Sequence, residues 1–376
     1  MEWGVYVHLP WCRKRCPYCA FVVDVRVDRP HAAYTAAVQR EWARQGGRYE
    51  GAPSTVYFGG GTPSLAPPAE IARLIDTFRP VANAEVTLEV NPGDLGDAAA
   101  ERMAAWRDAG VNRLSLGVQS FLPETARRLG RGHDPRDAWA LVEQARRAGF
   151  RSVSFDLIFG VPGQDLAGWV ADLDAAVRLD PGHVSLYGLT IHPGTTFAKR
   201  GVAPPDDDLW RALYDVAVER LEAAGLDRYE VANFARPGHR ARHNEHYWRG
   251  RPWLGLGVGA HGWWPDGTRT VNVDAVDAYL AAADPLATAA RPTPEELAAE
   301  LIGSTLRHVD GLDRAQLRAW TGLDVEVPAS LRNETVLIVD ADHLRLGREG
   351  FPLIDAVARR LCATLHPVGC EGAGPR

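Results

Sequence analysis

The sequence predicts an α/β fold: a partial (βα)6 barrel of the TIM type, followed by a small, mainly helical, winged-helix-like C-terminal domain. Six apolar, β-branched runs recur along the first half of the chain. Helical patterns lie between these runs, an alternation typical of a parallel sheet with crossover helices. Residues with special chemistry also gather where consecutive runs end, which is where barrels build their active sites.

The expected strands are runs rich in valine, leucine, isoleucine and aromatic residues. They cover residues 3–9, 55–58, 85–90, 113–118, 152–159 and 183–189. Apolar residues at helical spacing predict helices within residues 71–78, 138–145 and 166–177. A doubly wound sheet is the alternative, but no glycine fingerprint opens the first crossover.

Five consecutive strands carry unusual residues at or near their ends. A cysteine loop follows the first strand, and three glycines at 59–61 follow the second. Glu89 and Asn91 close the third strand, Gln119 closes the fourth, and Asp156 lies in the fifth. Because the carboxyl ends of barrel strands meet at one rim, we expect these residues to form a single site there.

The second half of the chain changes character. A long helix is expected over residues 206–224, whereas residues 226–272 are rich in Arg, His, Trp and Gly and show little period. Residues 273–365 have a helical pattern with one hairpin, in which 335–339 and 343–346 flank a turn. We therefore divide the chain into a barrel (1–232), a connecting segment (233–272) and a C-terminal domain (273–370).

Composition excludes several classes of protein. Hydrophobic residues make up 46% and charged residues 24%, which are ordinary globular values. The net charge of −6 gives no global electrostatic case for coating nucleic acid, so no nucleic-acid partner is expected. No apolar run reaches about 18 residues, which excludes a membrane span. No basic segment precedes an apolar core at the start of the sequence, so we expect a cytoplasmic location.

Three of the five cysteines fall in one short loop, Cys12-Arg-Lys-Arg-Cys16-Pro-Tyr-Cys19. This C-x3-C-x2-C spacing lets three thiolates converge on one inorganic centre. Three cysteines leave one iron of a [4Fe–4S] cluster without a protein ligand, and the basic residues between them favour thiolates. The alternative is a zinc site with His8 or a distant residue as fourth ligand, although no second cysteine pair exists.

The cysteine spacing on a first βα loop resembles that of radical S-adenosylmethionine (SAM) proteins. The resemblance implies that the open iron binds the amino and carboxylate groups of SAM. One electron then cleaves the sulfonium to methionine and a 5′-deoxyadenosyl radical.

Further motifs resemble the oxygen-independent coproporphyrinogen III oxidase family over roughly residues 3–320. They are Tyr6-Val-His-Leu-Pro-Trp-Cys12, Gly59-Gly-Gly-Thr-Pro-Ser-Leu65, Glu89-Val-Asn-Pro92, Leu116-Gly-Val-Gln-Ser-Phe121, Asp156-Leu-Ile-Phe-Gly-Val-Pro-Gly163 and Gly255-Leu-Gly-Val-Gly-Ala260. The resemblance implies a HemN-like C-terminal domain at 273–370.

Within that family the chain most resembles the HemW branch of heme chaperones, and less the decarboxylating HemN branch. Phe21 stands where HemN-type enzymes have a fourth cysteine, and the chain starts five residues before Tyr6, without their long N-terminal extension. His243-Asn-Glu-His-Tyr-Trp248 fits the HNxxYW motif of HemW. Departures are Ala20, in place of an acidic residue, and Gly188 and His192, where the branch usually has glutamates.

The resemblance implies the roles of the site residues. Cys12, Cys16 and Cys19 hold the cluster, and Tyr6 lies beside it. The predicted SAM contacts are Gly60, Gly61 and Thr62 to the methionine amino group, Glu89 to the ribose, Tyr18 on the adenine side, and Gln119, Arg131 and Asp156 to a second SAM. The glycines suit such a contact, because glycine has no Cβ to block a ligand's approach. The alternatives are that the glycine run is an ordinary loop, that Glu89 is a surface carboxylate and that Tyr18 is a core aromatic.

His243 is the candidate heme ligand, because a neutral imidazole nitrogen can bind heme iron. Arginines around it suit heme propionates, namely Arg236, Arg240, Arg242, Arg249 and Arg251. In the alternative interpretation, His243 and Asn244 hydrogen-bond a loop over the barrel mouth, and His246 and His261 are weaker ligand candidates. The arginines and nearby tryptophans also resemble a single-stranded nucleic-acid platform, a distant alternative.

We therefore expect a heme chaperone that binds heme and transfers it to an acceptor protein, with a [4Fe–4S] cluster and SAM in support. The alternative is an oxidase that converts coproporphyrinogen III to protoporphyrinogen IX by radical decarboxylation. Both need a low-potential electron donor and the same cysteines. The sequence leaves open whether the protein is an enzyme and assigns no catalytic residue.

Overall fold

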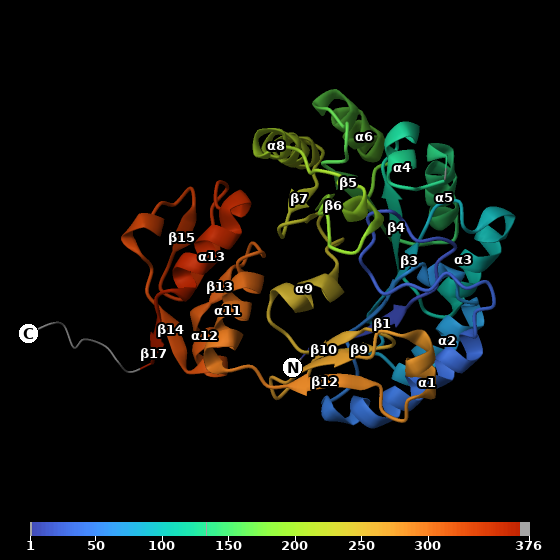
Figure 1. The fold of residues 1–376 in the computed structure, drawn as a ribbon, viewed down its shortest axis with the longest axis horizontal. Coiled ribbons are helices and arrows are strands. Elements are labelled where there is room, and N and C mark those ends of the chain that lie inside the picture. Colours follow the sequence, from blue (N-terminus) through green and yellow to red (C-terminus); the bar gives the residue numbers. More distant parts are fainter. Residues whose placement is uncertain (1, 133, 369–376) are drawn as a thin grey trace, which may run out of the picture.

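The structure is a computed structural model that describes residues 2–132 and 134–368. Six parallel strands lie side by side in chain order and form the predicted partial barrel (Figure 1). They are β1 (Gly4–Leu9), β2 (Thr55–Gly60), β3 (Glu85–Val90), β4 (Arg113–Gln119), β5 (Ser152–Phe159) and β6 (His183–Gly188). Each lies within one or two residues of its predicted bounds.

Helices cover the outside of these strands (Figure 1). They are α1 (His31–Gln45), α2 (Pro68–Phe78), α3 (Ala99–Asp108), α4 (Pro123–Arg128), α5 (Pro135–Arg147), α6 (Leu166–Arg178) and α8 (Asp207–Ala223). The short α7 (Thr196–Lys199) lies instead beside the cysteine loop, where Phe197 N donates to Pro17 O. The long helix expected at 206–224 is α8, whose first turn is capped by the side chain of Asp206 on the Leu209 amide.

The segment at 233–272, expected to be a connection, supplies strands to the same sheet. β9 (Trp253–Leu256) pairs in parallel with β1, so that β1 has a neighbour on each side. Antiparallel strands extend both edges, namely β10 (His261–Trp263), β11 (Arg269–Asn272) and β12 (Leu286–Ala290) beyond β9, and β8 (Asn233–Ala235) and β7 (Asp227–Arg228) beyond β6. The strand β12 corrects the helical pattern expected there, because its run of alanines pairs with β11 at the sheet edge.

The C-terminal part packs three helices, α11 (Pro294–Thr305), α12 (Arg314–Thr321) and α13 (Ile354–Cys362), with five short strands (Figure 1). The strands are β13 (Leu312–Asp313), β14 (Leu323–Val325), β15 (Leu337–Val339), β16 (His343–Leu346) and β17 (Leu365–Pro367). The predicted hairpin is β15 and β16. α10 (Val276–Ala281) lies between β11 and β12.

Two large apolar clusters and a small third one make up the buried core. The first takes its buried members from between Trp3 and Tyr279, and the second from between Trp263 and Leu361. The short helix α9 (Arg242–Trp248) lies between the barrel strands and the C-terminal helices (Figure 1). Among the described residues, no helix is both long and apolar enough to cross a membrane.

Candidate functional site

A cavity of about 720 Å³ opens at the carboxyl ends of the barrel strands. Its wall contains the cysteine loop and nearly all residues predicted to contact SAM. These residues are Cys12, Cys16, Tyr18, Cys19, Gly60, Gly61, Thr62, Glu89, Gln119, Arg131 and Asp156. Tyr6 is the exception: it lies within β1, where its hydroxyl is 3.1 Å from His8 Nδ1.

The backbone holds the cysteine loop at the cavity rim. Cys12 N donates to Asp24 O, Asp24 N donates to Pro10 O, and Cys19 N closes a turn on Cys16 O at 3.1 Å. All three cysteines are half-buried and form no disulfide, and burial raises the pKa of the Cys12 thiol to about 11. Three thiols on one short loop, open to a shared cavity, suit a multi-iron cluster.

The zinc alternative gains no support from His8. Its Nε2 lies 2.7 Å from Val22 O and its Nδ1 contacts the Tyr6 hydroxyl, so both ring nitrogens have protein partners. His8 therefore has no unoccupied ring nitrogen with which to complete a zinc site.

The glycine run packs directly against the cysteine loop. Gly61 N donates to Leu9 O and Thr62 N to Trp11 O, at 2.9 and 2.8 Å. Gly60 has a φ of +114°, and a Cβ there would lie 2.7 Å from the His8 ring. A side chain at position 60 would therefore be both strained and blocked. Since these amides already have partners, the loop offers carbonyl oxygens, the acceptors that an amino group needs.

Two partly buried carboxyl groups, Glu89 and Asp156, line the cavity. Glu89 Oε1 accepts from the Tyr57 hydroxyl at 2.8 Å, and Oε2 accepts from Gly60 N at 3.1 Å. Burial and the charge of Asp156 raise the pKa of Glu89 to about 7. Burial also raises the pKa of Asp156 to about 6, although the Ser115 hydroxyl donates to it at 3.1 Å.

Arg131 and Gln119 have polar atoms without protein partners. Arg131 donates to Asn91 Oδ1 at 2.7 Å and to the Tyr18 hydroxyl at 3.3 Å, but its Nε has none. Gln119 Oε1 is also buried and unpartnered, and its backbone has a φ of +67°, rare for a side-chain-bearing residue. Unsatisfied atoms and backbone strain at a cavity are typical of a ligand site. The cavity therefore fits a polar cofactor next to the cysteines.

Sequence reasoning missed Tyr57 in this wall, and it placed Asn91 at the rim without assigning it a contact. The Tyr57 hydroxyl holds Glu89, and Asn91 joins Thr62 Oγ1 to Arg131. The motif that contains Asn91 was visible, but Tyr57 lies inside an apolar strand, so nothing in the sequence marked it as polar wall.

His243 lies at the opposite end of the barrel. It is completely buried on α9, against the amino ends of β1 and β2. Its Nδ1 is 2.7 Å from Thr55 Oγ1 and its Nε2 is 2.7 Å from the Tyr247 hydroxyl. Both ring nitrogens therefore already have partners. These contacts fit the alternative interpretation, in which His243 has a structural role. They differ from it in place, because His243 lies at the amino end of the barrel strands and not at the barrel mouth.

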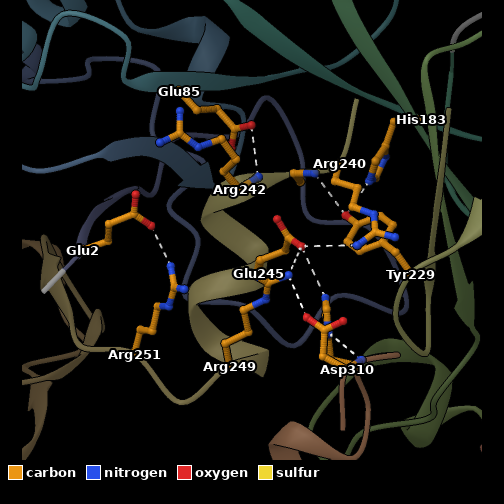
Figure 2. Close-up of polar contacts among 12 residues, drawn as sticks. Glu2, Glu85, His183, Tyr229, Arg240, Arg242, Glu245, Arg249, Arg251 and Asp310 are labelled. Carbon is orange, nitrogen blue, oxygen red and sulfur yellow. Dashed lines mark hydrogen bonds and ion pairs between the residues drawn. The ribbon is translucent and has the colours of Figure 1, made fainter. Parts of the chain in front are cut away.

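The arginines expected to bind propionates are paired with protein groups. Figure 2 shows Arg251 pointing to Glu2, and Arg249 pointing to Glu245 and Asp310, at 2.6, 3.0 and 2.9 Å. Arg236 pairs with Asp180 at 2.7 Å, Arg240 lies 3.8 Å from Glu245, and Arg242 donates to Asn83 O. The contacts of Arg242 and Arg249 join α9 to the barrel and to the C-terminal part. Of the weaker candidates, His246 is buried against Ser54 and His261 is exposed.

Comparison with known proteins agrees with this site. The radical SAM superfamily model matches residues 6–176. The heme chaperone HemW of Escherichia coli strain K12 is 39% identical over 272 residues, 70% of this chain and 71% of that protein. HemW of Mycobacterium tuberculosis strain H37Rv is 37% identical over 382 residues, 95% of this chain and 94% of its own. The chain belongs to the HemW family.

Membership of the HemW family confirms the resemblance seen in the motifs. It also supports the predicted cofactors, a [4Fe–4S] cluster and SAM, through the radical SAM superfamily. Among solved structures, the radical SAM enzyme HemN of Escherichia coli, a coproporphyrinogen III oxidase, aligns with a TM-score of 0.80 and 24% identity. The alignment covers 96% of this chain and 89% of HemN, which confirms the predicted fold.

Proposed function

We propose that this protein is a cytoplasmic heme chaperone, which binds heme and passes it to an acceptor protein. The observation that carries the proposal is the 37% identity to a heme chaperone along 95% of this chain, C-terminal part included. The cavity supports it, because one wall combines cysteines, polar groups without partners and exposed aromatic surface.

The chain's own residues prepare the cavity for two cofactors. Cys12, Cys16 and Cys19 would hold the cluster, and the carbonyls of the glycine run would accept from the SAM amino group. Glu89 and Arg131 would orient the remaining polar groups of SAM. When bound, the cluster supplies one electron to SAM, which must come from a low-potential donor. Gln119, Arg131 and Asp156 would bind a second SAM.

The alternative function is oxidative decarboxylation of coproporphyrinogen III. The fold shared with HemN favours it, but Phe21 stands in place of a fourth cysteine, and it is 67% exposed at the cavity rim. An anaerobic assay decides between the two. Reconstituted protein receives coproporphyrinogen III, SAM and a low-potential reductant, and mass spectrometry follows the loss of two carboxyl groups.

We expect SAM cleavage without decarboxylated product. Product at catalytic turnover would overturn the proposal in favour of the oxidase. The positive arm of the test is heme transfer: protein loaded with hemin is mixed with an apo-acceptor, and the heme content of each is measured after separation. Failure of the wild-type protein to retain hemin would also overturn the proposal.

A further inference from the structure

The cavity mouth carries one histidine whose surroundings differ from those of His243. His192 lies on the segment between β6 and α7, lines the cavity and is exposed. Its backbone carbonyl accepts from Thr195, but its ring makes no hydrogen bond within the described part of the chain. No other described histidine lines this cavity. A free imidazole therefore faces the space where the cofactors are expected.

The segment that carries His192 is fixed to the cysteine loop. Phe197 N donates to Pro17 O at 2.9 Å, and the rings of Phe197 and Tyr18 are in contact. Leu189 and Phe197 also belong to a small apolar cluster of their own, apart from the barrel core. The backbone of the segment that carries His192 is thus held beside the cysteine loop.

The same mouth offers surface suited to an amphipathic, flat ligand. Phe21 is 67% exposed, and Tyr187 presents part of its ring to the cavity beside Leu189. Lys14 and Arg15 of the cysteine loop also line the cavity. Apolar rings suit a porphyrin face, and the two cations suit its propionates.

Heme iron in proteins is bound by His, Cys, Met or Tyr side chains. In the described cavity wall there is no methionine, and the three cysteines are assigned to the cluster. Tyr57 donates to Glu89, and the Tyr18 hydroxyl accepts from Arg131. The Tyr187 phenol is protonated at neutral pH, which makes it a poor ligand. His192 remains.

We propose that His192 is an axial ligand of a heme seated across the cavity mouth, with Phe21 against the porphyrin and Lys14 and Arg15 toward its propionates. This inference rests on the proposed chaperone function and names its binding site. A ligand on an exposed segment suits a protein that must release its heme.

The test is a hemin titration of the full chain with its cluster reconstituted, so that the cysteines are occupied. Difference spectra give the Kd and the ligand field of the iron. We expect His192→Ala and His192→Glu to weaken binding about tenfold or more, since even lost support of a metal ligand costs about that much. Phe21→Ser is expected to weaken binding with an unchanged ligand field.

Controls separate ligation from folding. His261→Ala removes an exposed histidine outside the cavity and should titrate as wild type. In His192→Gly, added imidazole should restore the wild-type spectrum, which a purely structural role would not allow. A wild-type Kd and spectrum in His192→Ala would overturn the inference. So would loss of the spectrum in Tyr187→Phe, or in a folded His243→Ala. If wild type itself binds no hemin, the chaperone proposal fails, which is a distinct result.

Discussion

At the residue scale, burial and hydrogen bonding separate side chains that the sequence presents as equivalent. His243 and His192 are both candidate ligands by residue type. The first has both ring nitrogens bonded and no exposure, whereas the second has a free ring at a cavity mouth. Of the two His243 partners, Tyr247 lies within the HNxxYW motif, but Thr55 is distant in the chain, so the motif alone does not reveal that both ring nitrogens are used.

His243→Ala should destabilise the protein. The substitution leaves a cavity and deprives Thr55 and Tyr247 of a partner, so we expect a loss of about 2–4 kcal/mol in the free energy of unfolding. Urea titration measures it. As a control, Tyr247→Phe removes one of the two bonds and should cost about 1 kcal/mol. An unchanged urea midpoint in His243→Ala would contradict the structural role.

Serine at Cys12, Cys16 or Cys19 should abolish the cluster, because the alcohol is a much weaker iron ligand than a thiolate. Iron content and visible absorption after anaerobic reconstitution measure the loss. Cys362→Ser is the matched control, since this half-buried cysteine lies on α13, outside the cavity. A variant with serine at all three positions that kept the cluster's absorption would refute the ligand assignment.

At the scale of elements, the sequence predicted the strands that alternate regularly with helices and missed the short strands outside that pattern. Runs such as 85–90 and 152–159 match β3 and β5 in full, because apolar residues alternate with polar ones in both, which is the period-two pattern of a strand. β9 to β12 are strands of three to five residues with Trp, Gly and Ala, and they are defined by distant partners. The cavity residues were predictable because they follow these regular strands, whose carboxyl ends meet at one rim.

The turn after β2 depends on glycine. In Gly60→Ala the new Cβ would meet the His8 ring, and the φ of +114° disfavours any side chain. We expect the displaced loop to weaken SAM binding about tenfold or more, since small misplacements of binding groups are costly. Calorimetric titration of SAM into the reconstituted protein measures it.

Gly47→Ala is the control, because a Cβ there meets no atom within 4 Å. It should bind SAM as wild type does. Equal affinities of the two variants would show that the Gly60 backbone is not needed for the site.

At the scale of the whole molecule, the two apolar clusters meet around charged and titratable groups. α9 contributes Glu245 to a contact with His308, and Glu230 lies buried where the barrel pairs with His308 through a backbone bridge. Burial raises the pKa of Glu230 to about 8, from an ordinary value of 4.5. One of its oxygens accepts from Ala232 N, and the other has no partner.

This carboxyl makes stability depend on pH with a definite sign. Because the folded state holds the proton more tightly, its contribution is fully present below about pH 4.5 and is lost as the pH rises toward 8. Glu230→Gln removes this dependence. We expect the variant to gain more than about 1 kcal/mol over wild type between pH 5 and 8, since one pKa unit corresponds to about 1.4 kcal/mol. Urea unfolding at several pH values measures it; a difference that does not vary with pH would contradict the assignment.

The parallel pairing of β1 with β9 has a consequence for biosynthesis. The strand that leads into the cysteine loop gains its second neighbour only when residues 253–256 have been made. At about 5–20 residues per second, that is roughly 10–50 seconds after the cysteines leave the ribosome. During this interval the three thiols follow a strand that is paired on one side only, with β2. The complete cluster site is therefore available to the cell's cluster-assembly machinery only late in synthesis. A chain that ended before residue 253 would leave one edge of β1 unpaired.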